Sequence, residues 1–527
     1  MRRRGLLASA LAGATVLAAP RVVRADAARV LKFIPQSDLA TLDPHFTTAS
    51  VTREHGFLVF DTLYGMDNAW QAQPQMVAGH VVSDGGKLWE LTLRDGLMFH
   101  DGTKVLARDA VASIRRWGQR DAFGGVMLAR TDEISAPSDT VIRLRLNKPF
   151  ALVPDALAVI ISVPVIMPER LAKTDPFKQV TEMVGSGPYR FVASERVPGS
   201  RVVYERFAGY QPRGDGKPEF GSGPKVAHFD RVEWTVVPDP ATAAAALMSG
   251  EFDWWENPTI DLVPALRRNK DVAVMVKDRT TQNAIMRFNA LYPPFDNAAI
   301  RRLVVSAIDQ HDFMQAVGGA APDLIVPQKA GLFVPGTPMA SDVGVEVMQG
   351  AKDPAIIRQQ LAEAGYHGER IVVLAATDTP SANALAQVGA DLLRRIGFNV
   401  DYQSLDWGTV QQRRASKEPI DKGGWSIFFT LQTSTQNITP AAAVALRADG
   451  KGWYGWPTDA DMERLREAWF DAPDLAAQQQ ICRDMQTAFW RNPSYAPLGM
   501  LFQPTAFRTS LTDIREGLPQ FYGVRRV

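Results

Sequence analysis

Alternating apolar and polar residues predict β-strands along the first half of the chain. Residues 141–146 (VIRLRL) alternate cleanly, and Asn147 and Pro149 end the run. Between the strands, the apolar residues at 110, 111, 114 and 117 share one face of a predicted helix. Trp254 and Trp255 fall in an extended segment, so alternation predicts that at least one of them leaves the core face. Further strands are predicted at residues 30–34, 87–95, 188–191 and 232–237.

The second half contains a strand–helix–strand pattern. Residues 371–376 (IVVLAA) are continuously apolar, a helix is predicted over 381–396, and a second strand over 398–403. A connection of this length implies parallel strands, and ligands of such sheets bind beyond the carboxyl ends of the strands, here near Thr377. Two closing helices are predicted from Asp459 and Asp474. The pattern therefore indicates an α/β protein.

Length and composition narrow the class. The 527 residues suggest three to four domains, and 46% hydrophobic residues suffice for several cores. The 58 basic and 57 acidic residues give a net charge of +1, which argues against nucleic-acid binding. No run reaches the roughly 18 apolar residues of a membrane span. Cys482 is the single cysteine, which excludes an internal disulfide and a metal site built from several cysteines. It lies on the apolar face of a predicted helix, which favours a buried, inert thiol.

The first 25 residues are typical of an export signal. Three arginines at positions 2–4 precede an apolar stretch over 6–19, and Val23-Arg24-Ala25 offers a cleavage site. The mature chain would then begin at Asp26, in the periplasm or outside the cell. The paired arginines also resemble a twin-arginine signal. The alternative, a buried N-terminal helix, accommodates three leading arginines poorly.

Motifs for catalysis are missing from the sequence. There is no G-x-S-x-G elbow, H-E-x-x-H helix or P-loop, and Gly185-Ser186-Gly187-Pro188 is interpreted as a structural turn. The seven histidines never stand three or four residues apart, so no helix presents a metal-binding pair. We expect the histidines to be surface or capping residues.

Aromatic residues gather in the last third of the chain. Trp453, Tyr454 and Trp456 lie on a segment without helical or strand periodicity, and Trp425 begins a predicted strand. Rings on irregular segments often line binding sites, but they can equally fill a domain core. Both interpretations stay open from the sequence.

Several motifs together resemble one known family. They are residues 38–44 (DLATLDP) with 61–64 (DTLY), 83–89 (SDGGKLW) with 93–103 (LRDGLMFHDGT), 184–189 (VGSGPY), and 288–289 (FN) with 294–297 (PFDN) and 301–309. On these residues the chain resembles the extracellular solute-binding proteins of bacterial family 5, which serve peptide, nickel, glutathione and opine importers. The likeness spans nearly the whole mature chain.

The resemblance implies the architecture. It is an α/β, two-lobed periplasmic binding protein fold (type II) with an extra domain inserted in the first lobe. Residues 1–25 would be the signal peptide. Lobe one would comprise 27–60, 186–279 and 498–527, the inserted hairpin-rich domain 61–185, and lobe two 280–497.

One segment departs from the family pattern. Peptide-binding relatives commonly hold the ligand's amino terminus on an aspartate shortly after the strand that corresponds to 426–431. Here residues 432–440 (QTSTQNITP) contain no acid, so ordinary dipeptide specificity is not expected. No histidine follows His367, which disfavours nickel. A polar or amide-rich organic solute suits the segment better.

The resemblance implies a periplasmic subunit that captures a small organic, peptide-like solute by hinge closure. Its partners would be an inner-membrane ABC permease and its ATPase, and the protein would be a monomer without enzymatic activity, cofactor, metal or nucleic acid. The alternatives are an exported hydrolase of peptides or esters and a broad-specificity periplasmic peptide-holding chaperone. The candidate ligand-binding residues are Thr47, Trp255 and Asn257 in lobe one, and Trp425, Gln432, Asn437, Trp453, Tyr454 and Trp456 in lobe two.

Overall fold

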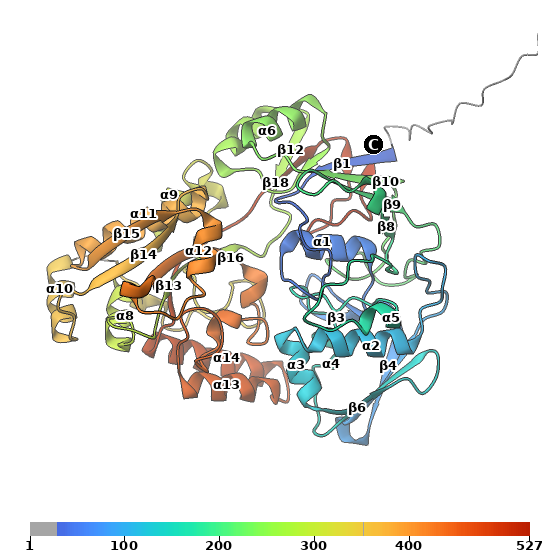
Figure 1. Cartoon of the computed structure of the whole chain (residues 1–527), viewed down its shortest axis with the longest axis horizontal. Coiled ribbons are helices and arrows are strands. Elements are labelled where there is room, and N and C mark those ends of the chain that lie inside the picture. Colours follow the sequence, from blue (N-terminus) through green and yellow to red (C-terminus); the bar gives the residue numbers. More distant parts are fainter. Residues whose placement is uncertain (1–28, 351–352) are drawn as a thin grey trace, which may run out of the picture.

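Two sheets define two lobes in the computed structural model, which describes residues 29–350 and 353–527 (Figure 1). The expected signal peptide at residues 1–25 lies outside the described residues. The first sheet, which we call the lobe-one sheet, has seven strands, and β1 pairs in parallel with both β10 and β11. Its order is β12 (Val272–Met275), β18 (Thr505–Arg508), β11 (Trp254–Trp255), β1 (Val30–Ile34), β10 (Arg231–Thr235), β9 (Arg201–Arg206) and β8 (Tyr189–Phe191).

The lobe-two sheet has five strands. β14 and β15 are parallel, with Arg370 opposite Asn399, whereas β13 is antiparallel to both β16 and β17. This confirms the parallel strand–helix–strand unit expected from the sequence. The order is β15 (Asn399–Leu405), β14 (Arg370–Ala376), β16 (Ile427–Thr433), β13 (Gln282–Phe288) and β17 (Tyr495–Leu501).

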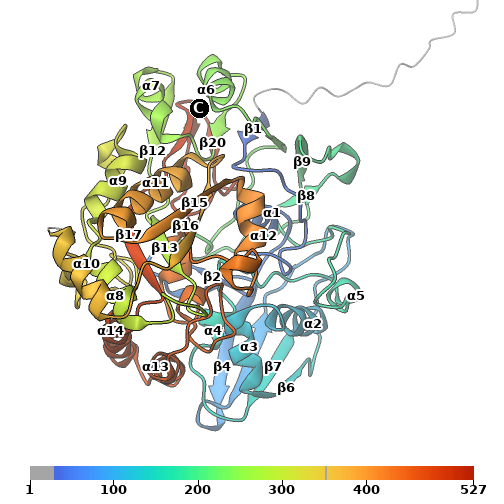
Figure 2. The ribbon, with the colours of Figure 1, turned by 60° about the vertical axis from the view of Figure 1, so that its left-hand side comes forward.

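Helices cover both faces of the lobe-two sheet, as Figure 2 shows. Ile371 and Val373 pack in the same core as Leu385 of α11, whereas Val372 and Leu374 pack with Val410 of α12. Both faces of β14 are therefore buried, which explains its continuous apolar run. The lobe-two helices are α8 (Ala298–Ser306), α9 (Gln310–Gly318), α10 (Pro354–Glu363), α11 (Pro380–Arg395), α12 (Trp407–Arg413), α13 (Ala460–Phe470) and α14 (Leu475–Arg491).

The inserted domain is built on an antiparallel four-stranded sheet and four helices. Its strand order is β4 (Val77–Ser83), β5 (Leu88–Leu93), β7 (Val141–Leu146) and β6 (Thr131–Ser135). Its helices are α2 (Ala107–Gly118), α3 (Ala122–Ala129), α4 (Val153–Ala156) and α5 (Glu169–Ala172). A short pair, β2 (Tyr64–Met66) and β3 (Ala72–Pro74), adjoins it. The domain boundaries predicted above are not tested by this arrangement and stay predictions.

Lobe one also contains α1 (Ser50–Val59), α6 (Pro240–Ser249), α7 (Val263–Arg268) and the pair β19 (Leu511–Thr512) and β20 (Arg525–Arg526). None of the helices in residues 29–350 and 353–527 combines the length and hydropathy that a bilayer-spanning helix needs. The chain passes between the two large sheets at residues 276–281, from β12 to β13, and again at 502–504, from β17 to β18. Both passages leave from neighbouring strands of the lobe-one sheet, β12 and β18, and both reach neighbouring strands of the lobe-two sheet, β13 and β17. Two adjacent connections of this kind suit a hinge.

The two consecutive tryptophans of β11 correct a sequence expectation. Trp254 packs in the main core, edge-on to Phe33, and Trp255 packs with Leu247 of α6 on the other face. They do point to opposite faces, but neither leaves a core, because both faces of the lobe-one sheet are covered there.

The turn at residues 184–188 has a structural role, as expected. Gly187 donates its backbone N–H to the carbonyl of Val59 at the end of α1, at 2.9 Å. A Cβ atom on Gly185 would lie 1.9 Å from that same carbonyl oxygen, so only glycine allows this approach.

A buried cluster of charged residues lies where α1, the end of β11 and the 276–281 passage meet. Glu54 and Glu256 are both buried, with Arg53, Lys277 and Asp278 beside them. Glu256 accepts hydrogen bonds from Gln36 N at 2.7 Å and Gln36 Nε2 at 3.0 Å. Among the described residues, the carboxylate of Glu54 has no hydrogen-bond donor. Burial, reinforced by Glu256, raises the pKa of Glu54 well above its usual value.

These shifts predict a pH-dependent effect of Glu54→Gln. Because the pKa of Glu54 is raised in the folded protein, the folded state holds this proton to higher pH than the unfolded chain does, and stability falls as the pH rises above the usual range of the carboxyl group. Glutamine removes this penalty. We expect the variant to gain about 1–3 kcal/mol near pH 8, and less at pH 5, in urea unfolding. A variant that is less stable than the parent at pH 8 would show instead that the Glu54 carboxylate is charged and stabilising.

Candidate functional site

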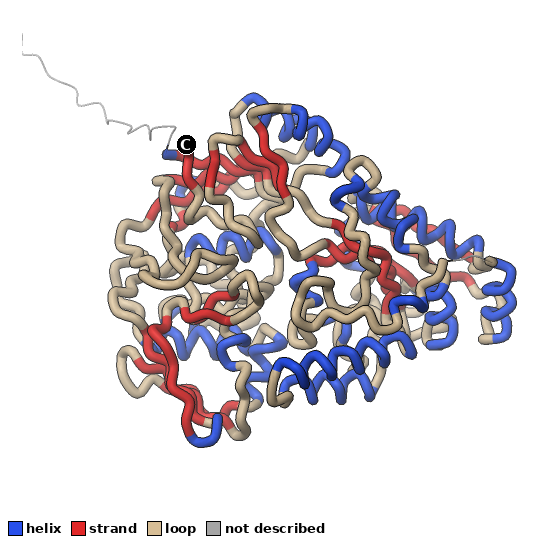
Figure 3. Tube along the Cα trace, turned by 180° about the vertical axis from the view of Figure 1, so that it is seen from behind, coloured by secondary structure: helices blue, strands red, loops and turns tan. Residues whose placement is uncertain are grey.

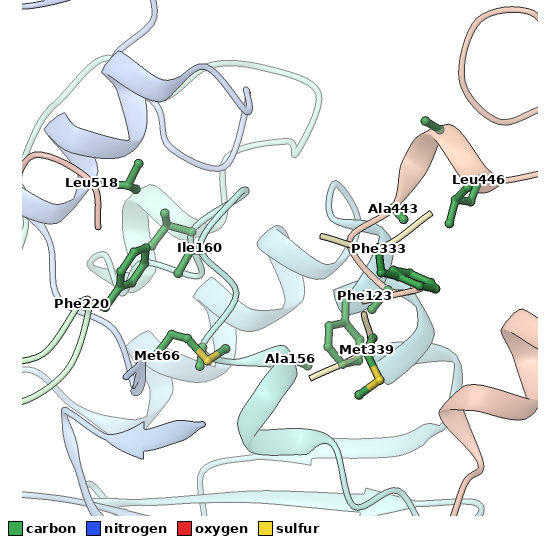
Figure 4. Packing of buried hydrophobic residues seen from close by; sticks show 14 of the residues in the cluster. Met66, Phe123, Ala156, Ile160, Phe220, Phe333, Met339, Ala443, Leu446 and Leu518 are labelled. Atoms are coloured by element: carbon green, nitrogen blue, oxygen red, sulfur yellow. The ribbon is translucent and has the colours of Figure 1, made fainter. Parts of the chain in front are cut away.

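A cavity of about 730 Å³ lies between lobe two and the part of the molecule formed by lobe one and the inserted domain. One wall consists of residues 45–48, the start of α3, Asp155 of α4 and residues 159–162. The facing wall belongs to lobe two, with Met339, residues 435–447, Trp469 of α13 and Gln478 of α14. Figure 4 shows Phe123 and Met339 side by side where the two walls meet. The cavity is of the size that ligand pockets typically have.

His45 lies on the first wall and is held by a buried ion pair behind it. Its backbone N–H donates to Asp43 Oδ1 at 3.0 Å, and Asp43 accepts a bidentate contact from Arg116 at 2.7 and 3.2 Å. Burial lowers the pKa of His45 to about 4, so the ring is neutral at physiological pH. Nε2 lies 3.1 Å from the carbonyl of Val165, which assigns the proton to Nε2 and leaves Nδ1 as an acceptor. Nδ1 has no partner among the described residues.

Two carboxylates lie on the same wall. Asp121 accepts from Gly124 N at 2.8 Å as the N-cap of α3, and burial raises its pKa to about 6. Burial also raises the pKa of Asp155, in the first turn of α4. Neither carboxylate has a salt-bridge partner within the described part of the chain.

Hydrogen-bond donors lie on the lobe-two wall. Trp469 is buried, and its Nε1–H finds no acceptor in the described residues. Arg447 pairs with Asp449 at 2.7 Å through Nη2, and its buried Nε likewise has no partner there. Of the described residues that line this wall, Arg447 alone has a charged side chain.

The walls are joined beside the cavity by contacts of Arg130, which follows α3. Its guanidinium binds Glu467 and, at 3.3 Å, Asp471 at the end of α13, and Lys148 reaches Asp471 at 2.9 Å. Next to these charges, Phe123 packs on Phe470 with ring centroids 5.7 Å apart. Figure 3 shows the helices of lobe two reaching the inserted domain along this edge. The two bodies are thus in direct contact beside the cavity in this structure.

Of the nine residues predicted to bind ligand, Thr47 lines the cavity. Gln432 and Asn437 are buried at the end of β16 and just beyond it, and each has a side-chain oxygen without a partner in the described chain. They adjoin Thr435, which lines the cavity, but they do not line it themselves. In lobe one, Trp255 packs against α6, and Asn257 Nδ2 lies 3.4 Å from Gln36 Oε1.

The remaining four predicted residues, all aromatic, gather away from the cavity lining. Trp425, Trp453, Tyr454 and Trp456 join one cluster with α12 and the outer face of β14. Arg414 lies over the ring of Tyr454 at 4.7 Å, and Lys417 over that of Trp456 at 5.1 Å. Such packing is expected if these rings fill a domain core, which is one of the two interpretations that the sequence left open. A ligand-binding role for the rings stays a prediction.

Sequence reasoning missed His45, Asp155 and Trp469 as cavity residues. The histidines were expected at the surface or at caps, but His45 and His55 are 1% and 0% exposed. In the interior, Nδ1 of His55 lies 2.9 Å from the Tyr204 hydroxyl, which gives the buried ring a polar partner. For His45 a signal existed: it directly follows Asp43-Pro44 within the family motif. Nothing local distinguishes Asp155 or Trp469.

The fold and the cavity are those expected of one class, the two-lobed solute-binding proteins. Comparison with known proteins gives the family. Residues 71–454 match the family model described as bacterial extracellular solute-binding proteins, family 5 Middle. The chain therefore belongs to family 5 of the bacterial extracellular solute-binding proteins, which confirms the resemblance found in the sequence.

Relatives agree over nearly the full length. The chain is 35% identical over 518 residues to a "probable peptide ABC transporter periplasmic-binding protein" of Sinorhizobium fredii, which covers 97% of both chains. It is 25% identical over 506 residues to a glutathione-binding protein of Pectobacterium atrosepticum, covering 93% and 91%. These relatives support a binding protein of an ABC transporter over the hydrolase and chaperone alternatives.

Solved structures share the fold. A periplasmic binding protein from A. tumefaciens R10 in complex with agropinic acid matches with a TM-score of 0.77 at 19% identity, covering 94% of this chain and 99% of that one. DppA from Helicobacter pylori in complex with the peptide STSA matches with a TM-score of 0.77 at 18% identity, covering 94% and 98%. The predicted two-lobed α/β fold is confirmed.

The aromatic cluster allows a test of Trp425→Ala. Trp425 is buried, so its truncation should lower the free energy of unfolding by about 3–5 kcal/mol. Because Trp425 does not line the cavity, the affinity of the folded variant for ligand should stay within about twofold of that of the parent. A twofold change in affinity corresponds to less free energy than one hydrogen bond contributes. Urea unfolding and calorimetric titration measure the two effects. Lost affinity with unchanged stability would place the site at the aromatic cluster instead.

Proposed function

We propose that this protein captures a peptide-like or other small polar organic solute in the periplasm and delivers it to an inner-membrane permease and its ATPase. It would be exported through the signal predicted at residues 1–25 and act as a monomer. The mechanism is closure of the two bodies on the solute, without bond making or breaking.

The observation that carries the proposal is that the cavity takes its walls from both bodies. Residues 45–48 and α4 contribute one wall, and residues 435–447 and α13 the other. A ligand between them contacts lobe two only in the closed arrangement, so it binds that arrangement more tightly and shifts the population toward it.

The character of the cavity supports a peptide-like solute. Apolar side chains such as Phe46, Ile161 and Ile438 alternate with polar groups such as Thr439 and Gln478. Amide groups and small side chains of a short peptide suit such a surface. The relatives named for peptides and glutathione agree with this class of ligand.

Two experiments test the proposal. Protein purified from its native periplasm should release, on denaturation, a small organic solute that mass spectrometry identifies. Purified protein should also bind members of a panel of di- to tetrapeptides and glutathione. If nothing in the panel binds and the released material is not a small organic solute, the proposed ligand class is wrong.

Filling the cavity should selectively weaken binding. Ala442 lines the lobe-two wall, and Ala442→Trp should weaken binding of the released solute by roughly 5- to 150-fold, the cost of overpacking. Ala245→Trp, on the exposed side of α6, is the matched control and should leave the affinity unchanged. Equal affinities of both variants in calorimetric titration would show that the solute binds elsewhere.

A further inference from the structure

The guanidinium of Arg287, in the interior of lobe two, is a buried cation that pairs with no carboxylate of the described chain. The residue is 0% exposed. Elsewhere in the molecule, buried Arg116 pairs with Asp43 and buried Lys225 pairs with Asp61, each at 2.7 Å. Burial lowers the pKa of Arg287 to about 9, so the group is still cationic at neutral pH. Because a buried charge is costly unless it is paired, the charge of Arg287 requires an explanation.

One nitrogen of this guanidinium is left without an acceptor in the described chain. Nε donates to the carbonyl of Tyr454 at 2.6 Å, and Nη1 donates to the carbonyl of Ala445 at 2.9 Å and to Ser494 Oγ at 3.1 Å. Nη2 is buried and finds no acceptor among the described residues. The Trp453 ring, with its centroid 5.1 Å from the guanidinium carbon, adds a cation–π contact, which does not neutralise the charge. A buried donor of this kind points to a bound water or ion.

A second donor lies beside Nη2. Tyr495 stands opposite Arg287 in the antiparallel register of β17 and β13, so the two side chains project from the same face of the sheet. The tyrosine is buried, and its hydroxyl has no hydrogen-bond partner in the described chain. Burial raises the pKa of Tyr495, and the nearby charge of Arg287 opposes that rise, which agrees with their closeness. The hydroxyl therefore stays protonated and can donate a hydrogen bond, as Nη2 can.

The surroundings of these two donors favour an anion over a water molecule. A second buried cation, Arg301, adds its positive potential to that of Arg287. It holds the same segment of chain, because its Nε donates to the carbonyl of Pro493 at 2.8 Å. Two donors in an enclosed place suit a monatomic ion with a single charge. Phosphate or sulfate has four oxygens, and each oxygen left without a donor would add a desolvation cost.

We propose that lobe two binds one chloride ion between Nη2 of Arg287 and the hydroxyl of Tyr495. The ion accepts a hydrogen bond from each group and neutralises the guanidinium. The site lies behind the lobe-two wall of the cavity, because Arg287 holds the carbonyl of Ala445 and the adjacent Val444 lines that wall. The chloride thus supports the wall from inside lobe two, whatever solute the cavity takes.

Bromide replaces chloride and scatters X-rays anomalously, so it locates the ion directly. Crystals of the parent protein grown in bromide should show an anomalous peak within hydrogen-bonding distance of both Arg287 Nη2 and the Tyr495 hydroxyl. Tyr495→Phe should weaken or abolish the peak, because one of the two donors is removed. This variant is preferable to a change at Arg287, which would also remove three hydrogen bonds. A parent structure with a water molecule and no anomalous peak at this place would overturn the proposal.

A melting-temperature titration measures the same site in solution. An ion that binds only the folded state stabilises it by mass action, so replacing gluconate with chloride at constant ionic strength should raise the melting temperature of the parent by about 2 °C or more. The rise should be much smaller in Tyr495→Phe. Tyr366→Phe is the matched control, because it removes a lobe-two hydroxyl that donates to the carbonyl of Glu369 at 2.9 Å, and it should keep the full chloride response. Equal chloride responses in the parent and in Tyr495→Phe would show that no chloride binds at this site.

Discussion

The contact of Arg130 with α13 is the interaction on which the closed site depends. The two lobes are linked covalently only by the adjacent passages at 276–281 and 502–504, so a second contact must complete the cavity on the side away from them. Arg130 and Lys148 provide it by binding Asp471. Because Asp471 is 43% exposed, its ion pairs contribute at most about 1 kcal/mol each. A contact this weak can hold a closed state without making closure irreversible.

The interior of the cavity opposes closure unless ligand is present. The residues that line the cavity include buried groups, such as His45 Nδ1 and Trp469 Nε1–H, that have no partners in the described chain. The desolvation cost of such groups is comparable to what the Arg130 contact contributes. A ligand that satisfies them changes the balance, so that binding and closure become one coupled equilibrium.

The sequence predicted local elements well because their signals are local. Asp459 and Asp474 accept hydrogen bonds from Met462 N and Ala477 N as N-caps of α13 and α14, at the residues where the helices were expected to begin. The fold followed from family motifs whose roles are largely structural, such as the Asp43–Arg116 pair.

The cavity could not be predicted in the same way. His45, Asp155 and Trp469 are separated by more than a hundred residues each, and only the packing of the inserted domain on lobe two brings them to one cavity. Conversely, Trp453 and Trp456 lie on an irregular segment, which suggested a binding loop. The structure places them against α12, a contact that periodicity cannot reveal. Burial of an aromatic ring depends on partners that are distant in sequence.

Ligand-dependent closure is most directly measured as a distance between the inserted domain and lobe two. Spin labels at Asp132→Cys, exposed on β6, and Gln480→Cys, exposed on α14, report it, and the native Cys482 is buried. Without the natively bound solute, we expect the distances between the two labels to be long and broadly distributed. When the solute is restored, the distribution should become narrow and shift to shorter distances. An identical distance distribution with and without saturating solute would contradict closure as the mechanism of capture.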